Sequence, residues 1–320
     1  MMRNKVVIGT RGSKLALWQA NWVRDRLTQL YPELKVEIEK IKTTGDKILD
    51  TPLAKIGGKG LFVKEIEEAL ISKRVDIAVH SMKDVPAEIP SGLHISAICK
   101  REDPKDAFLS KKGVSIVKLP YGATVGTSSL RRAIQIKALR SDLNILPLRG
   151  NVDTRIRKLN EGKFDAIILA LAGLKRMGLE GMVTEVISED IIIPAIGQGA
   201  IGIETRIDDD YINELVKPLN DPETALCVNT ERVFLSVVGG GCQLPLACHA
   251  KIENSNFKVV GMIGDPYGEI SIIKGKREMK LSDINYQSFL SEAEKLAKEL
   301  AEELLKRGGS IIIEKIYKER

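Results

Sequence analysis

The chain has 320 residues, 43% of them hydrophobic, which is enough for two or three folded domains and excludes a disordered protein. Its net charge is +6, but only 4% of its residues are aromatic, so an anionic small molecule is a better expected ligand than a nucleic acid. Four cysteines without framework spacing, no apolar signal segment after Met1 and no membrane-length apolar run predict a soluble, cytoplasmic protein.

The first hundred residues predict an α/β domain. Strands are expected over residues 5–9, 35–43 and 75–79, and helices over residues 14–30 and 61–73. The segment 45–60 has no clear period and is interpreted as a surface loop, although Lys55 and Lys59 leave open a mobile lid that carries two cations. Gly58-Lys59-Gly60 lacks the Ser or Thr of a phosphate loop.

The next hundred residues repeat this plan. Strands are expected over residues 123–126, 144–148 and 164–170, and helices over residues 130–139 and from about Arg155. Ile8-Gly-Thr10 corresponds to Val125-Gly-Thr127, and Lys73–Ala78 corresponds to Gly162–Ile167. These matches predict two related α/β domains, each with a mostly parallel sheet.

A crossover and a third domain complete the chain. Gly197-Gln198-Gly199 formally begins a dinucleotide fingerprint, but a strand rather than a helix is expected next, so a return to the first domain explains these glycines better. Helix 224–238, strands 246–253, 258–264 and 269–276, and helix 286–306 predict a small α+β domain. The expected domain bounds are 1–100 with 200–217, then 104–194, then 222–320.

Cys242 follows Gly239-Gly-Gly241 and precedes Pro245, which places its thiol on a loop with little side-chain cover. Cys99 and Cys227 lie instead within apolar runs, as buried cysteines do. Considered alone, Cys242 fits an unused reduced thiol and a reactive thiol about equally well.

Other catalytic schemes have less support in the sequence. The histidines are scattered, and Cys242-x5-Cys248-His249 is not a zinc spacing, so no metal is expected. A thiol hydrolase would need a base for Cys242, and the sequence leaves open whether His80 or His249 lies near it.

Cationic and polar residues follow the predicted strands, and ligands of open parallel sheets bind beyond the carboxyl ends of the strands. Arg131 and Arg132 begin a helix, where the dipole disfavours cations, and an anion bound between them would offset this. A solvated face explains a single arginine more simply. Five arginines at equivalent positions favour a cleft for a ligand with several carboxylates or phosphates: Arg131, Arg132, Arg149, Arg155 and Arg176.

Asp84 is a lone carboxylate among these cations. It is either an ion-pair partner or a group that stabilises a cation formed in the reaction and accepts N–H donors from the substrate.

Seven motifs together give the chain a resemblance to a known family. They are Gly9-Thr-Arg-Gly-Ser13, Gly57-Gly-Lys-Gly-Leu-Phe62, His80-Ser-Met-Lys-Asp-Val-Pro86, Gly126-Thr-Ser-Ser-Leu-Arg-Arg132, Arg149-Gly-Asn151, Gly197-Gln-Gly199 and Gly241-Cys242. Over essentially its whole length the chain resembles the porphobilinogen deaminase (hydroxymethylbilane synthase) family.

The resemblance implies a fold and a reaction. The fold would be two periplasmic-binding-protein-like (type II) α/β domains plus a small α+β domain with a three-stranded antiparallel sheet. The enzyme would be a cytoplasmic, monomeric transferase of tetrapyrrole synthesis with a dipyrromethane primer joined to Cys242 by a thioether. It would add four porphobilinogens head to tail with loss of ammonia, and water would release hydroxymethylbilane. The alternative is a cytoplasmic two-domain anion-binding receptor.

The resemblance also implies roles for individual residues. The implied catalytic residues are Asp84, Arg11, Arg149, Arg155 and Lys59. The primer would be held by Cys242, Ser81, Lys83, Asp84, Thr127, Ser128, Ser129, Arg131, Arg132 and Arg176. The substrate would be bound by Arg11, Ser13, Phe62, Arg149, Asn151, Arg155 and Gln198. Each pyrrole carries an acetate and a propionate, which would account for the many arginines.

Overall fold

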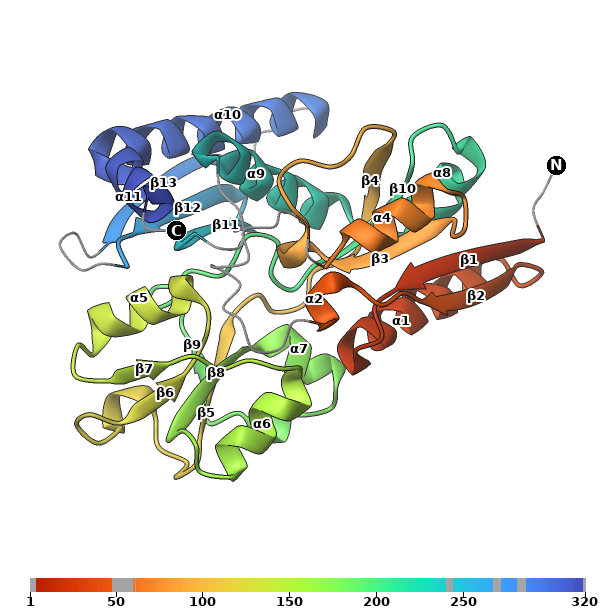
Figure 1. The fold of residues 1–320 in the computed structure, drawn as a ribbon. Coiled ribbons are helices and arrows are strands. Elements are labelled where there is room, and N and C mark those ends of the chain that lie inside the picture. Colours follow the sequence, from red (N-terminus) through yellow and green to blue (C-terminus); the bar gives the residue numbers. More distant parts are fainter. Residues whose placement is uncertain are drawn as a thin grey trace. The chain divides into compact units, whose positions relative to one another are not determined.

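The computed structural model describes residues 4–47, 60, 62–239, 244–266, 272–280 and 286–318. The chain divides into two compact units, which Figure 1 shows as ribbons. Unit 1 comprises residues 1–51, 58–102 and 199–225, and unit 2 comprises residues 52–57, 103–198 and 226–320. Among the described residues, no helix combines the length and the apolar character needed to cross a membrane.

Unit 1 contains a five-stranded sheet in the order β2-β1-β3-β10-β4. β1 (Lys5–Thr10) lies between β2 (Lys35–Lys40) and β3 (Ile77–Ser81) and is parallel to both. β10 (Ile201–Arg206) runs antiparallel between β3 and β4 (Leu93–Ile98). The crossover glycines therefore lead into a strand, as predicted, and not into the helix of a dinucleotide site.

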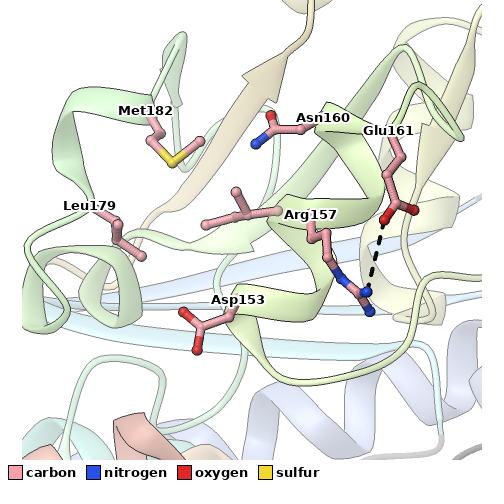
Figure 2. Close-up of a pocket in the computed structure, with 7 residues that line it drawn as sticks. Asp153, Arg157, Asn160, Glu161, Leu179 and Met182 are labelled. Atoms are coloured by element: carbon pink, nitrogen blue, oxygen red, sulfur yellow. Dashed lines mark ion pairs between the residues drawn. The ribbon is translucent and has the colours of Figure 1, made fainter.

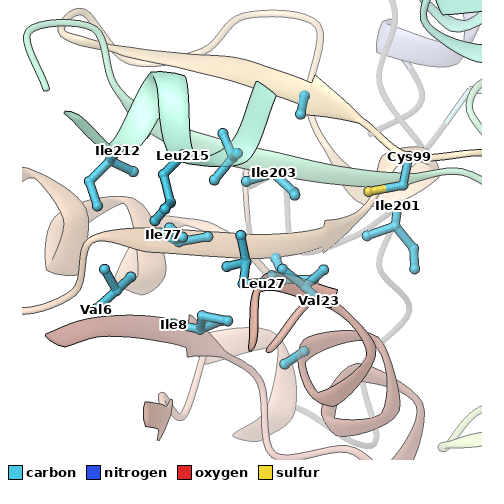
Figure 3. Close-up of a cluster of buried hydrophobic side chains, with 14 of the residues drawn as sticks. Val6, Ile8, Val23, Leu27, Ile77, Cys99, Ile201, Ile203, Ile212 and Leu215 are labelled. Atoms are coloured by element: carbon cyan, nitrogen blue, oxygen red, sulfur yellow. The ribbon is translucent and has the colours of Figure 1, made fainter. Parts of the chain in front are cut away.

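Helices complete unit 1. They are α1 (Lys14–Leu30), α2 (Thr44–Lys47), α4 (Lys64–Ile71), the short 3-10 turn η1 (Met82–Asp84), α8 (Asp210–Val216) and η4 (Lys217–Leu219). Ser13 caps α1 by accepting a hydrogen bond from the Ala16 N–H. Figure 3 shows the main core, where Ile8 of β1, Leu27 of α1 and Leu215 of α8 are buried around the sheet.

Unit 2 repeats the sheet in the order β7-β6-β8-β5-β9. β6 (Thr124–Gly126) is parallel to β7 (Asn144–Leu146) and β8 (Ala166–Ala170), and β5 (Asp106–Ser110) is antiparallel to β8 and to β9 (Glu185–Ile187). The helices of this part are η2 (Ile116–Lys118), α5 (Leu130–Leu139), α6 (Val152–Asn160), α7 (Leu171–Arg176) and η3 (Glu180–Met182).

The C-terminal part of unit 2 has a three-stranded antiparallel sheet of β11 (Leu246–Glu253), β12 (Asn256–Gly264) and β13 (Ile272–Lys280). Its helices are α9 (Pro222–Val238), α10 (Tyr286–Leu304), the π-helical turn η5 (Leu305–Gly309) and α11 (Ser310–Lys318). The predicted fold class, two mostly parallel α/β sheets and a small antiparallel sheet, is confirmed. The division into three domains stays a prediction, because contacts place residues 226–320 in unit 2.

The structure corrects several predicted boundaries. α6 begins at Val152 and not near Arg155, because Asn151 occupies the cap position and Asp153 the first turn. The prediction missed β4, β5 and β9, which pair antiparallel with strands that are distant in the sequence. It also ended β13 too early. The last residues of this strand, up to Lys280, are alternately exposed and half-buried and include several charged side chains, so they do not form an apolar run.

The two α/β sheets are equivalent residue by residue. Ile8 and Gly9 pair with Ile77 and Ala78, and Val125 and Gly126 pair with Ala166 and Ile167 in the same register. Asp76 accepts a hydrogen bond from the Val7 N–H, and Asp165 accepts one from the equivalent Thr124 N–H. The predicted repeat is thus present in the hydrogen bonds as well as in the order of the strands.

Comparison of the two repeats also identifies one residue with an unfavourable backbone conformation, Lys73. The helices α4 and α6 are followed by equivalent residues with left-handed backbone, Lys73 with a φ of 60° and Gly162 with a φ of 77°. A side chain raises the energy of this conformation, and glycine does not.

Lys73→Gly should therefore stabilise the protein by about 0.5–1 kcal/mol, because it removes that strain and only part of the gain is offset by the greater freedom of glycine in the unfolded chain. Urea unfolding followed by circular dichroism measures the change. Gly162→Ala is the matched control and should destabilise. A lower unfolding free energy for Lys73→Gly would contradict the proposed equivalence.

Candidate functional site

Most predicted site residues of unit 2 lie just after β6, β7 and β8. These three strands are parallel neighbours, so their carboxyl ends meet at one edge of the sheet. The site residues that follow them are Thr127, Ser128, Ser129, Arg131, Arg132, Arg149, Asn151, Arg155 and Arg176. The topology thus brings together residues spread over fifty positions of the sequence.

The hydroxyl residues after β6 begin α5. Ser129 is the N-cap, and its Oγ accepts a hydrogen bond from the Arg132 N–H at 3.4 Å. Thr127 Oγ1 accepts one from the Ser129 N–H, and Ser128 Oγ donates to the Leu148 carbonyl. These contacts fix the backbone from which Arg131 and Arg132 project.

Arg131 and Arg132 are buried, and both bind the carboxylate of Asp106, which is fully buried. Arg131 Nη1 donates to Asp106 Oδ2 at 2.7 Å, and Arg132 Nη2 donates to Oδ1 at 2.7 Å. Arg132 also donates through Nε to Oδ1 at 3.1 Å. The anion expected between the two arginines is therefore supplied by the chain itself.

The electrostatics of this cluster depend on Asp106. Burial alone would raise the pKa of its carboxyl, but the charges and hydrogen bonds of Arg131 and Arg132 hold that pKa well below its ordinary range. Burial, together with repulsion from Arg132, lowers the pKa of Arg131 despite the attraction of Asp106. Two guanidiniums and one carboxylate leave the cluster with a net positive charge, which suits an anionic ligand.

The sequence analysis missed Asp106. This residue begins β5, an antiparallel strand, and pairs with Ala170 at the carboxyl end of β8. A rule that searches only the carboxyl ends of strands passes over the start of an antiparallel strand at the same edge. The apolar run that follows Asp106 was the available signal.

Gln198, predicted to bind substrate, belongs to the same cluster. Its Nε2 donates to Asp106 Oδ1 at 3.0 Å and to the Pro104 carbonyl at 2.5 Å, and the residue is buried. Both acceptors of the Gln198 Nε2 group therefore belong to the protein itself.

The other arginines differ in how they are held. Arg155 Nε donates to the Gly150 carbonyl at 2.7 Å, and Arg176 is buried at the end of α7. Arg149 is half-buried, and its guanidinium has no hydrogen-bond or ion-pair partner in the described part of unit 2. Asn151 is exposed at the start of α6 and does not cap it with its side chain.

In unit 1 the site residues follow β1 and β3, which are also parallel neighbours. Arg11 follows β1 and donates to Asp46 Oδ1 at 2.5 Å through Nη2, while its guanidinium lies 4.3 Å from the centre of the Phe62 ring. Partial burial acts to raise the pKa of Asp46, but Arg11 and Thr43 hold it below its ordinary value. Asp46 is a second positioning residue that the sequence analysis missed.

Asp84 lies in η1, directly after β3, beside Lys83 and close in sequence to Ser81. Its carboxylate is half-buried and makes no hydrogen bond or ion pair with the described residues of unit 1. No described residue of unit 1 therefore neutralises the negative charge of Asp84, which argues against a purely structural ion pair with any of them.

Lys59 and Cys242, two predicted site residues, lie outside the described residues. The three described cysteines form no disulfide with one another and are buried: Cys99 is 1% exposed, Cys227 5% and Cys248 0%. The described residues contain no group of three His, Cys, Asp or Glu side chains that could hold a metal ion.

A surface pocket of about 510 Å³ lies between α6 and the segment that contains Leu179 and Met182 (Figure 2). It is lined by Asp153, Ile156, Arg157, Asn160, Glu161, Leu179 and Met182. Arg157 and Glu161 pair with each other across one helical turn. None of the predicted site residues lines this pocket, so it is not the candidate site.

Comparisons with known proteins cover the whole chain. A family described as "Porphobilinogen deaminase, dipyromethane cofactor binding domain" matches residues 6–214, and "Porphobilinogen deaminase, C-terminal domain" matches residues 225–306. The chain is 50% identical to the porphobilinogen deaminase of Geobacter sulfurreducens, covering 99% of this chain and 96% of the relative. It is 48% identical to that of Carboxydothermus hydrogenoformans, covering 99% of each.

Two of the solved structures that resemble the chain do so only distantly. The periplasmic aliphatic sulphonate binding protein SsuA from Escherichia coli covers 73% of this chain, which covers 70% of SsuA, with 16% identity and a TM-score of 0.40. The BvgS VFT2 domain from Bordetella pertussis covers 69% of this chain, which covers 89% of that domain, with 14% identity and a TM-score of 0.40. Similarity at this level adds nothing to the assignment.

Asp106→Asn should destabilise the protein by about 3–5 kcal/mol, because it leaves two buried guanidiniums without their charge partner. The depressed pKa means that this stabilisation is present above the ordinary aspartate pKa of about 4 and is lost as the pH falls below it. In thermal unfolding between pH 3 and 8, the Tm of the variant should therefore fall less at acid pH than the Tm of the parent.

The matched control for this experiment is Glu161→Gln, which removes the partner of Arg157 at the surface of the same unit. Its effect should be far smaller, because solvent screens that pair. Equal effects of the two substitutions would contradict a central role for Asp106.

Proposed function

Because the chain belongs to the porphobilinogen deaminase family, we propose that it is a transferase that condenses four porphobilinogen molecules head to tail. Ammonia leaves at each addition, the product grows on a covalently bound dipyrromethane primer, and water releases hydroxymethylbilane. The observation that carries this proposal is the match of about half of all residues over the full length of named porphobilinogen deaminases. The alternative of an anion-binding receptor has no such support.

We propose Cys242 as the attachment point of the primer. Cys99, Cys227 and Cys248 are buried in their units and offer no thiol to a group of this size. Cys242 is the remaining cysteine, and from the glycines that precede it in the sequence we expect a thiol with little side-chain cover. When bound, the dipyrromethane supplies the pyrrole carbon to which the first substrate is joined.

The cationic edge of unit 2 suits a chain of pyrroles. Each pyrrole adds an acetate and a propionate, so the negative charge of the bound chain rises with every addition. Arg131 uses only Nη1 for its contacts with Asp106 and Ile193, which leaves Nε and Nη2 without a recorded partner in the described part of the chain. Arg149 has no recorded side-chain partner there either, so both can bind carboxylates.

The remaining roles follow from the same chemistry. Ser81, Lys83, Thr127, Ser128, Ser129, Arg132 and Arg176 are proposed to hold the primer. Arg11, Ser13, Phe62, Lys59, Asn151, Arg155 and Gln198 are proposed to serve the substrate and the growing chain. Asp46 and Phe62 hold the guanidinium of Arg11 in one orientation, which favours recognition of a planar carboxylate.

Asp84 is proposed to act at the step that releases ammonia. Departure of the amine leaves a cationic azafulvenium group on the substrate, and a nearby carboxylate lowers the energy of that cation. The same oxygens can accept hydrogen bonds from pyrrole N–H groups. The absence of a partner for Asp84 among the described residues of unit 1 supports this role, because a neutralised carboxylate would stabilise a new cation less.

We further propose that the enzyme acts as a monomer in the cytoplasm. All of the assigned residues come from one chain, so a second copy is not needed. Cys99, Cys227 and Cys248 form no disulfide with one another, which is typical of a reducing compartment. Neither a nucleic acid nor a membrane is needed for the proposed reaction.

The intact mass of the purified protein should exceed its sequence mass by one dipyrromethane, and peptide mapping should place the adduct on Cys242. Cys242→Ser should lack both the adduct and activity, whereas the control Cys99→Ser should carry the adduct. Fully active protein with an unmodified Cys242 would overturn the covalent-primer proposal.

Asp84→Asn should lower kcat by about 10²–10⁴, because the amide keeps the shape but not the charge that stabilises the cation. KM should change much less, since the interaction is made mainly in the transition state. Rates are normalised to the fraction of molecules that carry the adduct. Asp210→Asn, at an exposed acid of α8, is the matched control, and a normalised kcat within about tenfold of the parent in Asp84→Asn would favour an ordinary ion-pair role.

A further inference from the structure

Three titratable side chains are buried together in unit 1, and the proposed reaction does not use them. His80 Nε2 of β3 lies 2.8 Å from Glu204 Oε2 of β10, and the two side chains are only 4% and 2% exposed. Glu67, on the buried face of α4, is 8% exposed and is close enough to interact electrostatically with both. We call Glu67, His80 and Glu204 the triad.

The internal repeat shows what the fold itself requires at these positions. Ala78 of β3 is equivalent to Ile167 of β8, so His80, two residues later, is equivalent to Leu169. Glu204 pairs with Ala78, and Leu109 pairs with Ile167, so Glu204 is equivalent to Leu109. Glu67 corresponds to Ile156, because α4 and α6 are followed at the same distance by the equivalent Lys73 and Gly162.

The three equivalent residues of unit 2 are apolar and pack in one hydrophobic cluster. Leu109 is 1% exposed, Leu169 3% and Ile156 8%. The same fold is therefore satisfied by aliphatic packing where unit 1 carries two carboxyl groups and an imidazole.

The triad is also an unfavourable choice for stability. Burial removes charged groups from water, and hydrophobic replacements of buried ion pairs are often neutral or stabilising. Glu204 Oε1 is buried and has no hydrogen-bond partner among the described residues. A sheet that could hold aliphatic side chains instead holds an incompletely satisfied polar group.

The triad lies directly behind the turn that carries Asp84. His80 is followed by Ser81, the last residue of β3, and then by η1 (Met82–Asp84). The Met82 N–H donates to the Ala200 carbonyl, just before β10. Gly202, opposite His80 in the sheet, leaves room for Met82, since a Cβ there would lie 2.1 Å from Met82 Sδ.

We propose that Glu67, His80 and Glu204 form a buried acid–imidazole–acid site that serves the reaction rather than the fold, by positioning the Asp84 turn and setting the charge behind it. These are positioning residues, because they act through Asp84 and not on the substrate. The inference rests on the proposed function, in which Asp84 stabilises a cation.

Glu67 makes the charge of this site adjustable. Its burial, and then the charge of Glu204, raise its pKa to about 7, against the opposing effect of His80. Glu68 of the same helix adds a smaller effect in the same direction as burial. Glu67 thus stays protonated below neutral pH and adds a buried negative charge above it.

The test transplants the side chains of unit 2 into unit 1, as the triple variant Glu67→Ile, His80→Leu, Glu204→Leu. We expect it to fold, with a Tm equal to or above that of the parent. Its kcat, normalised to the fraction that carries the adduct, should fall by about 10–100-fold, since small misplacements of a catalytic group have effects of this size. KM should stay within about threefold.

Either of two results would overturn the proposal: a triple variant that turns over within about threefold of the parent, or one that does not fold, which would make the triad structural. The parent is assayed in parallel. A parent that is inactive on porphobilinogen overturns the proposed function, whereas an active parent and an equally active triple variant overturn only the role of the triad.

Two further variants separate positioning from general destabilisation. Gly202→Ala keeps the triad but displaces Met82, so it should also lower normalised kcat. Asp209→Asn removes a different buried ion pair of unit 1, with Arg206, and should lower the Tm without lowering normalised kcat. An effect of Asp209→Asn on turnover equal to that of the triple variant would contradict positioning.

The pH profile adds a readout that a purely structural role would not change. Glu67→Gln keeps the size of the side chain but cannot ionise, so kcat near pH 6 should stay within about threefold of the parent. The parent profile should contain a titration near pH 7 that the variant lacks. Identical profiles for the two proteins would overturn the charge-setting part of the proposal.

Discussion

The ion-pair cluster around Asp106 is the constraint on which the binding edge of unit 2 depends. A ligand with many carboxylates needs several guanidiniums close together, and close guanidiniums repel one another. One fully buried carboxylate offsets part of this repulsion and receives donors from Arg131, Arg132 and Gln198. Because the offset is only partial, the cluster keeps a net positive charge for its ligand.

The internal repeat shows how one framework of strands carries different charged residues in the two units. Both sheets share their strand order, register and even the aspartate that hydrogen-bonds to the first strand. At the start of the equivalent antiparallel strands, however, unit 2 has Asp106 and unit 1 has Ile201. Each unit thus keeps the common framework and places its charged residues at different positions within it.

Local signals predicted much of the fold. The helices α1 and α5 have the predicted bounds, because Ser13 and Ser129 cap them and the apolar spacing is regular. The strands β4, β5 and β9 were missed although β4 and β5 are longer than the predicted β6 and β7, so length is not the reason; they pair antiparallel with strands that are distant in the sequence. The candidate site residues that follow parallel strands lie together as the sequence predicted. Asp46 and Asp106 contact them from 35 and 25 residues away in sequence, which no local pattern records.

Two aspartates at the strand ends show why the same residue type can have opposite roles. Asp106 is fully buried and saturated by guanidinium donors, so its charge is already neutralised and cannot stabilise a new cation. Asp84 is half-buried and has no partner in the described part of unit 1, so its charge remains available. Electrostatic catalysis requires a charge that is fixed in place but not neutralised before the reaction. This physical criterion supports the proposal that Asp84, and not Asp106, is the carboxylate that acts on the substrate.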